Sequence, residues 1–213
     1  EVLTALGSQL VLSGEVTTGV PLLQGVVAKN TRRYDAQLLL GHHWHTTGKW
    51  PDAITALEAY FTSRPPALAK EDGRHRVDLA DAYLRHRQPA KALALFQRSV
   101  GERGLDPGLA RHSGRAGETL YNDVRARIGV AWATAAIDCR KARPLLRELE
   151  PIAETYPEIW LVDGQCALAV GDANGGLALG RRYLERAVLA SPAAKARGPI
   201  QVAAGHALVG ESH

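Results

Sequence analysis

The chain has 213 residues, of which 46% are hydrophobic and only 6% aromatic, and its formal net charge is +4. This composition favours closely packed helices over a β-sandwich, and few runs alternate in the way that strands do. No apolar stretch approaches the ~20 residues that span a bilayer. The mild positive charge is spread over scattered arginines, which is typical of an ordinary solvated surface.

Apolar periodicity predicts a helix at the start of the chain and a second helix soon after it. Residues 1–13 form the first helix, and Gly14 ends it. Thr18 or a neighbouring residue caps the second helix, so that Pro21 falls in the opening turn, where proline is tolerated. The first helical hairpin then ends near Asn30.

Two further hairpins are predicted downstream. The second uses residues 35–46 and 51–64, with Pro51 at the favoured first helical position. Pro65 cannot continue the helix, so the hairpin ends there. After a longer linker comes the third hairpin, whose second helix starts at Pro89.

Residues 101–117 interrupt this pattern. They are rich in glycine and arginine and leave little apolar surface to bury, so we expect a mobile loop. The loop is either a tolerated insertion or a basic contact arm. A fourth hairpin follows over residues 118–156, and Pro144 and Pro151 are expected to make its second helix irregular or kinked.

A fifth hairpin is predicted over residues 157–192, with the glycine-rich segment 171–176 lengthening its turn. This segment has no Gly-Lys-Ser/Thr ending and no preceding strand, so it does not indicate a phosphate loop. Residues 198–209 are expected to form one last helix. It either covers the final hairpin or marks the edge of a longer array.

A small residue recurs on the first helix of each hairpin. Gly41 follows Leu40 and is followed by Trp44, Ala53 and then Pro65, so two helices can approach closely at Gly41 and Ala53 while large side chains fill the space around them. The position equivalent to Gly41 in the other hairpins is occupied by Gly7, Ala80, Gly129 and Gly164.

This pattern resembles the tetratricopeptide repeat, a helix-turn-helix unit of about 34 residues, and 41 − 7 = 34 is that spacing. The resemblance implies an all-α superhelix of about five repeats plus a C-terminal helix, in one domain over residues 1–213. The repeats would take residues 1–33, 34–67, 73–100, 118–156 and 157–192.

In this family the first helices line a concave groove that commonly holds an extended peptide or a partner helix. The resemblance therefore implies a non-enzymatic scaffold, without a cofactor, that binds a protein whose identity the sequence does not reveal. A larger bacterial assembly is expected, such as envelope secretion or motility machinery, in the periplasm or the cytoplasm. The groove residues that this alignment of repeats predicts are His42, His45, Thr46, Arg74, Asp81, Arg85, Arg127 and Gln165.

Two alternatives remain open. The basic surface and the 101–117 arm would suit nucleic acid, which predicts retention on heparin that weakens steeply with salt. His42 and His45 share a helix face and, with a third ligand such as Asp81, would suit a metal-dependent enzyme. Surface histidines without a metal are the interpretation that we favour, so no metal site is assigned.

Cys139 and Cys166 are the only cysteines, and their spacing fits neither zinc nor an iron–sulfur cluster. Sequential packing of helices would bring them into the same neighbourhood. We expect two buried or half-buried thiols rather than a disulfide.

Overall fold

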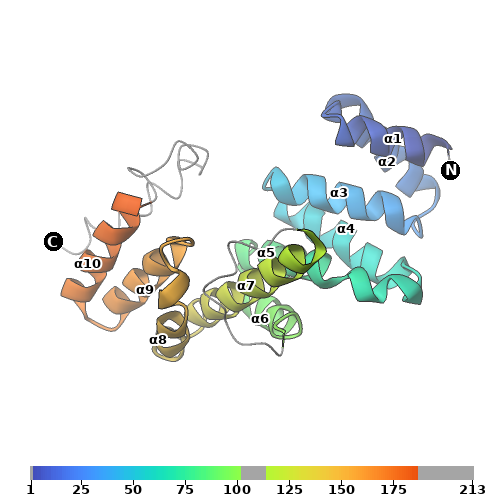
Figure 1. Cartoon of the computed structure of the whole chain (residues 1–213). Coiled ribbons are helices and arrows are strands. Elements are labelled where there is room, and N and C mark those ends of the chain that lie inside the picture. The colour runs from blue at the N-terminus through green and yellow to red at the C-terminus, as the bar shows by residue number, and fades with distance from the viewer. Residues whose placement is uncertain (1, 102–113, 187–213) are drawn as a thin grey trace. The chain divides into compact units, whose positions relative to one another are not determined.

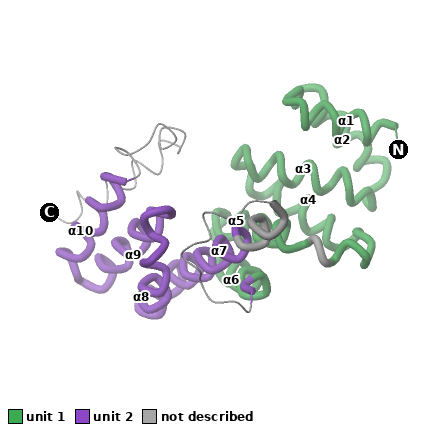
Figure 2. The backbone as a smooth tube through the Cα atoms, in the orientation of Figure 1, with its two compact units in different colours: residues 1–99 green, residues 100–213 purple. Residues whose placement is uncertain are grey.

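The computed structural model describes residues 2–101 and 114–186 (Figure 1). Within these ranges it contains ten α-helices, two short 3-10 helices and no strand, so the predicted all-α fold is confirmed. The chain divides into two compact units, residues 1–99 and 100–213 (Figure 2). No helix of the described part is long and apolar enough to cross a membrane.

Unit 1 consists of three antiparallel helix pairs, each joined by a short turn. Consecutive helices pack against one another, and the first helices α1, α3 and α5 also contact one another in sequence. The elements are α1 (Val2–Leu12), α2 (Val16–Lys29), α3 (Tyr34–Thr46), α4 (Trp50–Ser63), the 3-10 helix η1 (Pro66–Glu71), α5 (Gly73–Arg85) and α6 (Pro89–Gln97).

Close approach of α3 and α4 depends on Gly41. A Cβ at this position would lie 2.7 Å from both Cγ and Cδ2 of Leu57, a side chain that is fully buried. The turn between the two helices needs a second glycine for another reason. Gly48 has φ +75°, a backbone conformation that residues with a side chain rarely adopt. The predicted contact between a small residue and a large one is therefore present in the second hairpin.

Unit 2 contains two further helix pairs, and one apolar cluster joins them. Val124 of α7, Leu146 of α8, Trp160 of α9 and Tyr183 of α10 are all buried in this cluster. The elements are α7 (Gly114–Ala135), α8 (Cys139–Glu148), the 3-10 helix η3 (Glu150–Ile152), α9 (Glu158–Ala169) and α10 (Ala173–Leu184).

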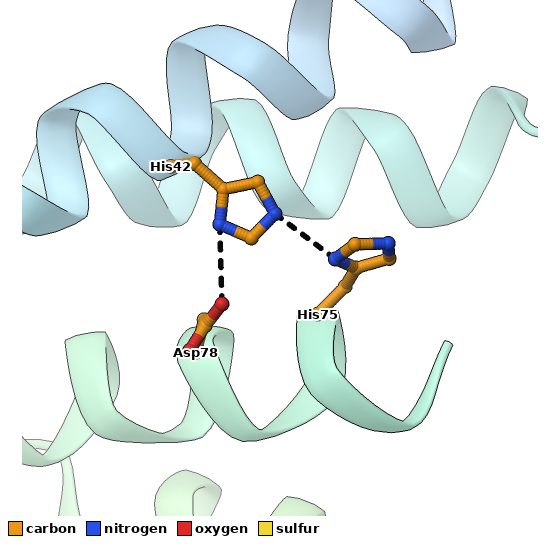
Figure 3. A group of neighbouring side chains, drawn as sticks. All are labelled: His42, His75 and Asp78. Atoms are coloured by element: carbon orange, nitrogen blue, oxygen red, sulfur yellow. Dashed lines mark hydrogen bonds and ion pairs between the residues drawn. The ribbon is translucent and has the colours of Figure 1, made fainter. Parts of the chain in front are cut away.

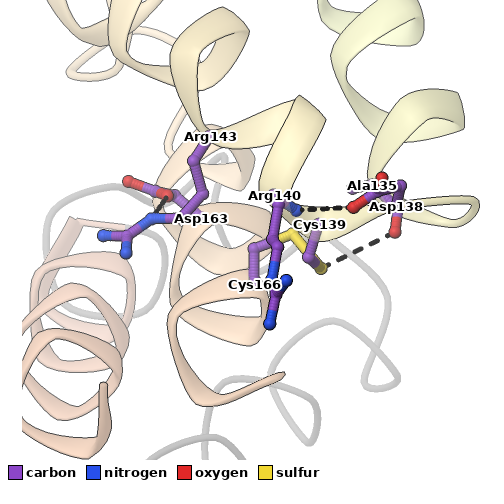
Figure 4. Close-up of a disulfide and its surroundings, with 7 residues drawn as sticks. All are labelled: Ala135, Asp138, Cys139, Arg140, Arg143, Asp163 and Cys166. Carbon is purple, nitrogen blue, oxygen red and sulfur yellow. Dashed lines mark hydrogen bonds and ion pairs between the residues drawn. A yellow bond between two sulfur atoms is a disulfide. The ribbon is translucent and has the colours of Figure 1, made fainter. Parts of the chain in front are cut away.

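A disulfide links Cys139, the first residue of α8, to Cys166 of α9 (Figure 4). The expectation of two free thiols is therefore wrong. Packing of α8 against α9 brings the two Cα atoms to 4.9 Å, which lies within the range that a disulfide spans. The sequence placed the two cysteines on neighbouring helices but did not show that these two positions face each other.

Three local predictions also need correction. Helix α2 begins at Val16, so Pro21 lies inside the helix and not in its opening turn. Helix α10 begins at Ala173, because the side chain of Asp172 accepts a hydrogen bond from the Gly175 backbone N–H and caps the helix. The glycine-rich segment is therefore largely helical and does not lengthen the turn. Similarly, α7 begins at Gly114, inside the predicted insertion.

Pro144 and Pro151 occupy the irregular part of the fourth hairpin. Pro144 lies inside α8, which ends at Glu148, and Pro151 lies in the 3-10 helix η3 that follows. The predicted contact arm falls mainly on residues 102–113, and the predicted last helix falls on residues 198–209. Both lie outside the described residues.

Candidate functional site

The candidate site of unit 1 is built on one face of α5. Arg74, Asp78, Asp81 and Arg85 follow one another at intervals of four, three and four residues, which places them along one side of a helix. Helix α3 lies beside α5 and brings His42 and His45, also three residues apart, to the same side. We call this surface, with Thr46 and His75, the α3–α5 face.

His42 connects α3 to α5 through both of its ring nitrogens (Figure 3). Its Nδ1 lies 3.1 Å from Oδ2 of Asp78, and its Nε2 lies 2.9 Å from Nδ1 of His75. A neutral His42 that donates from Nδ1 to the carboxylate must accept at Nε2, so His75 then donates from Nδ1. Burial lowers the pKa of His75, so the neutral form of His75 is favoured.

His45 forms a separate bridge one turn further along α3. Its Nε2 lies 3.0 Å from Oδ2 of Asp81, whose Oδ1 lies 3.4 Å from Nε of Arg85. The ring of Trp50, at the start of α4, meets His45 edge-on at 5.6 Å and lies 5.9 Å below the guanidinium of Arg85. Asp81 is therefore held between a histidine and an arginine, beside an aromatic ring.

A buried carboxylate fixes the start of α5 beneath this face. Asp72 is fully buried and accepts hydrogen bonds from Nε of Arg64 at 2.8 Å and from the hydroxyl of Tyr60 at 3.3 Å. The second guanidinium nitrogen, Nη2 of Arg64, bonds the other carboxylate oxygen. Tyr60 also packs edge-on against the ring of His75 at 5.4 Å. Asp72 thus ties the end of α4 to α5 and supports the side chain of His75.

The family model for the tetratricopeptide repeat matches residues 46–110, a segment that includes α4, η1, α5 and α6. Residues 46–110 therefore carry the tetratricopeptide repeat. The family named from the sequence is therefore confirmed. No curated protein matches the chain.

Several solved structures share the fold over most of the chain. YrrB, described as a tetratricopeptide repeat protein with an unusual peptide-binding site, aligns with a TM-score of 0.61 and 13% identity, covering 92% of this chain and 89% of YrrB. MamA aligns with a TM-score of 0.60 and 15% identity, covering 87% of this chain and 90% of MamA. PilW is described as a widely conserved type IV pilus biogenesis factor. It aligns with a TM-score of 0.59 and 12% identity, covering 99% of this chain and 89% of PilW.

The predicted groove residues fall in both units. Six of them lie on α3 and α5 of unit 1, where the structure brings His42, His45, Asp81 and Arg85 into the two bridges described above. Arg74 and Thr46 are exposed at the two ends of this face. Their role in binding a partner stays a prediction.

The other two residues lie in unit 2. Nε of Arg127 donates to Oδ2 of Asp123 at 3.0 Å, and its Nη2 donates to the backbone carbonyl of Gly101 at 2.9 Å. Arg127 thus stabilises the start of unit 2 as well as lying on a first helix. Gln165 of α9 is exposed.

The residues that could bind a metal ion differ from those that the sequence suggested. His42 and His45 do not converge on Asp81: in the described part of the chain, the group that gathers its ligand atoms is His42, His75 and Asp78. The sequence analysis missed His75. Two signals pointed to it, namely the three-residue spacing of His75 and Asp78 on one helix and their distance of about one repeat from His42.

Proposed function

We propose that this chain is a non-enzymatic scaffold that binds an acidic peptide segment of a partner protein on the α3–α5 face. The tetratricopeptide repeat fold itself suggests an interaction scaffold. The observation that carries the more specific proposal is the distribution of charge on α5. Asp78 and Asp81 each lie beside a histidine of α3, and the exposed Arg74 and Arg85 place positive charge at the two ends of the face.

The two arginines are well placed for an extended peptide. Arg74 and Arg85 are eleven residues apart on α5, which is about three helical turns and about 16 Å along the axis. Arg85 keeps 39% of its side chain exposed while it contacts Asp81. Guanidinium groups bind carboxylates in a two-pronged geometry, so acidic side chains spaced along a peptide would meet one arginine at each end.

Between the arginines, the face offers a partly apolar floor. Trp50 and the partly exposed rings of His42 and His45 supply area that a peptide can cover. Thr46 adds an exposed hydroxyl beside them, which already donates to the backbone of its own helix. Affinity would come mainly from contact with the rings, and the arginines would select orientation and partner.

The solved structures with the same fold give the proposal its context. One is described by its peptide-binding site and another as a pilus biogenesis factor. We therefore propose that this scaffold works in a larger bacterial assembly. The disulfide between Cys139 and Cys166 favours an oxidising compartment such as the periplasm over the cytoplasm, because cytosolic reductants keep most thiols reduced.

Unit 2 carries its own candidate contact residues, Arg127 and Gln165, on the first helices α7 and α9. We propose them for a contact of that unit with the same partner or with a second one. Since Arg127 already holds Asp123 and the backbone of Gly101, its replacement would also loosen the start of the unit. Gln165→Ala is therefore the cleaner variant for this part of the proposal.

The test is a selection of peptides from a random display library on the full chain. The wild type is compared with the double variant Arg74→Glu/Arg85→Glu and with the control Lys29→Glu/Arg32→Glu, which makes the same charge change at exposed positions of unit 1. We expect acidic sequences from the wild type and the control. For the double variant, we expect their affinity to fall by at least about tenfold.

Equal binding by all three proteins would rule out the α3–α5 face as the docking surface. Equal loss in both charge variants would instead indicate binding through net charge alone. In that case a steep dependence of heparin retention on salt would favour the nucleic-acid alternative.

A further inference from the structure

We infer that His42, His75 and Asp78 form a binding site for a divalent transition-metal ion, with Zn²⁺ as the ion that fits the ligands best. Each residue offers one ligand atom, and the three atoms lie within 4.8 Å of one another. His42 comes from α3, whereas His75 and Asp78 come from α5 (Figure 3). The site therefore joins two consecutive helix pairs of unit 1.

The chemistry of the three ligands suits such an ion. Two imidazole nitrogens and one carboxylate oxygen are a common zinc set, with a water or another ligand in the fourth position. At zinc–ligand distances near 2 Å, neighbouring ligand atoms in a tetrahedron are about 3.3 Å apart. His42 and His75 already bring two nitrogens to 2.9 Å, and Asp78 lies 3.1 Å from the other nitrogen of His42. Because His42 uses a different nitrogen for each of these contacts, metal binding requires its ring to turn so that one nitrogen faces both partners.

The three ligands are buried to different extents, as expected for a metal ion with one coordination position open to solvent. The side chain of Asp78 is 6% exposed, whereas that of His42 is 25% exposed. An ion can therefore reach the ligands from solvent, while α5 supplies a protected carboxylate.

The residues around the ligands hold them in place. Tyr60 packs edge-on against His75, and its hydroxyl donates to Asp72, which two arginines also contact. Such supporting contacts orient metal ligands and limit the rearrangement that binding requires. Asp72 thus sets the start of α5, three residues before His75 and six before Asp78.

The proposed site differs from the one that the sequence suggested. His45 and Asp81 are occupied with each other, with Arg85 and with Trp50, and they are not ligands here. The metal site shares His42 and His75 with the α3–α5 face, but its test does not depend on a peptide, because it measures metal binding by the chain alone. Metal bound by His42 and α5 would tie the second helix pair to the third and stabilise unit 1.

The experiment uses the full chain without a histidine tag, stripped with a chelator and then exchanged into buffer with Zn²⁺. Metal content after gel filtration is measured by mass spectrometry, and the dissociation constant by competition with a chromogenic chelator. The variants are His75→Gln and Asp78→Asn, which remove one ligand each. The controls are His45→Gln, which tests the bridge next to the site, and His86→Gln, an exposed histidine just after α5.

We expect one Zn²⁺ per wild-type chain and a rise of several degrees in the melting temperature of unit 1 on loading. Each ligand variant should weaken binding by at least about tenfold, while both controls bind like the wild type. The proposal is overturned if the wild type retains no stoichiometric metal, or if His75→Gln and Asp78→Asn bind as tightly as the wild type. Loss in His45→Gln with retention in His75→Gln would likewise overturn it.

Substitution of Co²⁺ keeps the test decisive if a ligand variant fails to fold. Wild-type protein with Co²⁺ bound to the three ligands and a water should show visible absorption bands of a four-coordinate nitrogen and oxygen site, without sulfur charge-transfer bands. The spectrum of six-coordinate hydrated Co²⁺ would mean that no such site forms.

Discussion

The two units of this chain share one fold but join consecutive helix pairs by different means. In unit 1 the second and third pairs meet through charged and polar side chains: His42 with Asp78, His45 with Asp81, and Arg64 with the buried Asp72. In unit 2 the fourth and fifth pairs meet through an apolar cluster and the disulfide between Cys139 and Cys166.

The two units therefore also differ in how deeply their ion pairs are buried. The carboxylate of Asp72 is fully buried, so its ion pair with Arg64 is sensitive to the loss of either partner. In unit 2 the ion pair between Arg182 and Glu150 is about half exposed, with the guanidinium over the ring of Trp160 and the carboxylate accepting from Nε1 of that ring. Exposed pairs of this kind contribute little to stability.

The repeat therefore determines the structure of each hairpin, whereas the contacts between hairpins differ from one unit to the other. Polar connections can hold a metal ion or a charged partner, and they bring ionisable side chains to the surface. In unit 2 the ion pairs of Arg143 with Asp163 and Asp172 are added to a connection that is mainly covalent and apolar. Unit 1 is therefore the part of the chain in which a binding site is expected, and unit 2 is the part whose stability depends on redox conditions.

Replacement of Asp72 by alanine should have the largest effect on unit 1. It leaves Arg64, of which only 17% of the side chain is exposed, without its carboxylate and also removes a partner of Tyr60. The expected loss is about 3 to 5 kcal/mol of unfolding free energy. Hydrogen exchange measured by mass spectrometry would show faster exchange in α4 and α5, with unit 2 unchanged.

Asp52→Ala is the matched control, since this carboxylate is exposed in the first turn of α4. It should cost no more than about 1 kcal/mol, through the helix dipole alone. If the two variants are equally stable, the buried ion pair is not what connects α4 to α5.

Removal of the disulfide should have the next largest effect, and it should be confined to unit 2. The cross-link joins residues 27 positions apart, for which the loss of chain entropy in the unfolded state gives about 3 to 4 kcal/mol. Chemical unfolding of Cys139→Ala/Cys166→Ala should show this loss, and reductant should produce it in the wild type. Unfolding of unit 2 at the same denaturant concentration with and without reductant would mean that the bond does not form.

Replacement of Arg143 by methionine should weaken the polar part of unit 2. Nε of Arg143 lies 3.4 Å from Asp163 (Figure 4). Its Nη2 lies 3.5 Å from Asp172, which caps α10. Burial raises the pKa of Asp163, and Arg143 opposes that rise. The variant should lose about 1 to 3 kcal/mol at pH 7.

The pH dependence of this loss identifies its cause. Because the pKa of Asp163 is raised in the folded protein, ionisation destabilises the fold as the pH rises, and removal of Arg143 increases that effect. The deficit of the variant, measured by urea unfolding, should therefore shrink as the pH falls toward about 4. Arg140→Met, on the exposed side of the same helix, should show no such dependence.

Local packing in this molecule was predictable because it repeats. Gly41 and Leu57 make the contact that their spacing indicates, and Ala53 and Ala80 are fully buried as small residues between helices should be. A contact within one hairpin depends on helical periodicity and on a short turn, and both can be read from neighbouring residues.

Contacts between hairpins were less predictable. His42 meets His75 only because α3 and α5 stand in one particular register, and Cys139 meets Cys166 for the same reason on α8 and α9. A shift of one residue would turn either side chain by about 100° on its helix. The burial of Asp72 was equally hidden, because a charged residue in a linker rich in alanine and proline resembles solvated surface.

The smallest effects should come from two glycines of unit 1 that differ only in their surroundings. Gly41→Ala places a Cβ 2.7 Å from Cγ and Cδ2 of the buried Leu57, so α3 and α4 must move apart, at a cost of about 1 to 3 kcal/mol. Gly25→Ala, in α2, adds a Cβ with no atom within 4 Å, so it should stabilise the helix by about 0.5 to 1 kcal/mol. The melting temperature should therefore fall for Gly41→Ala and rise for Gly25→Ala. A rise for both variants would mean that helix propensity, not the close approach of α3 and α4, decides stability at Gly41.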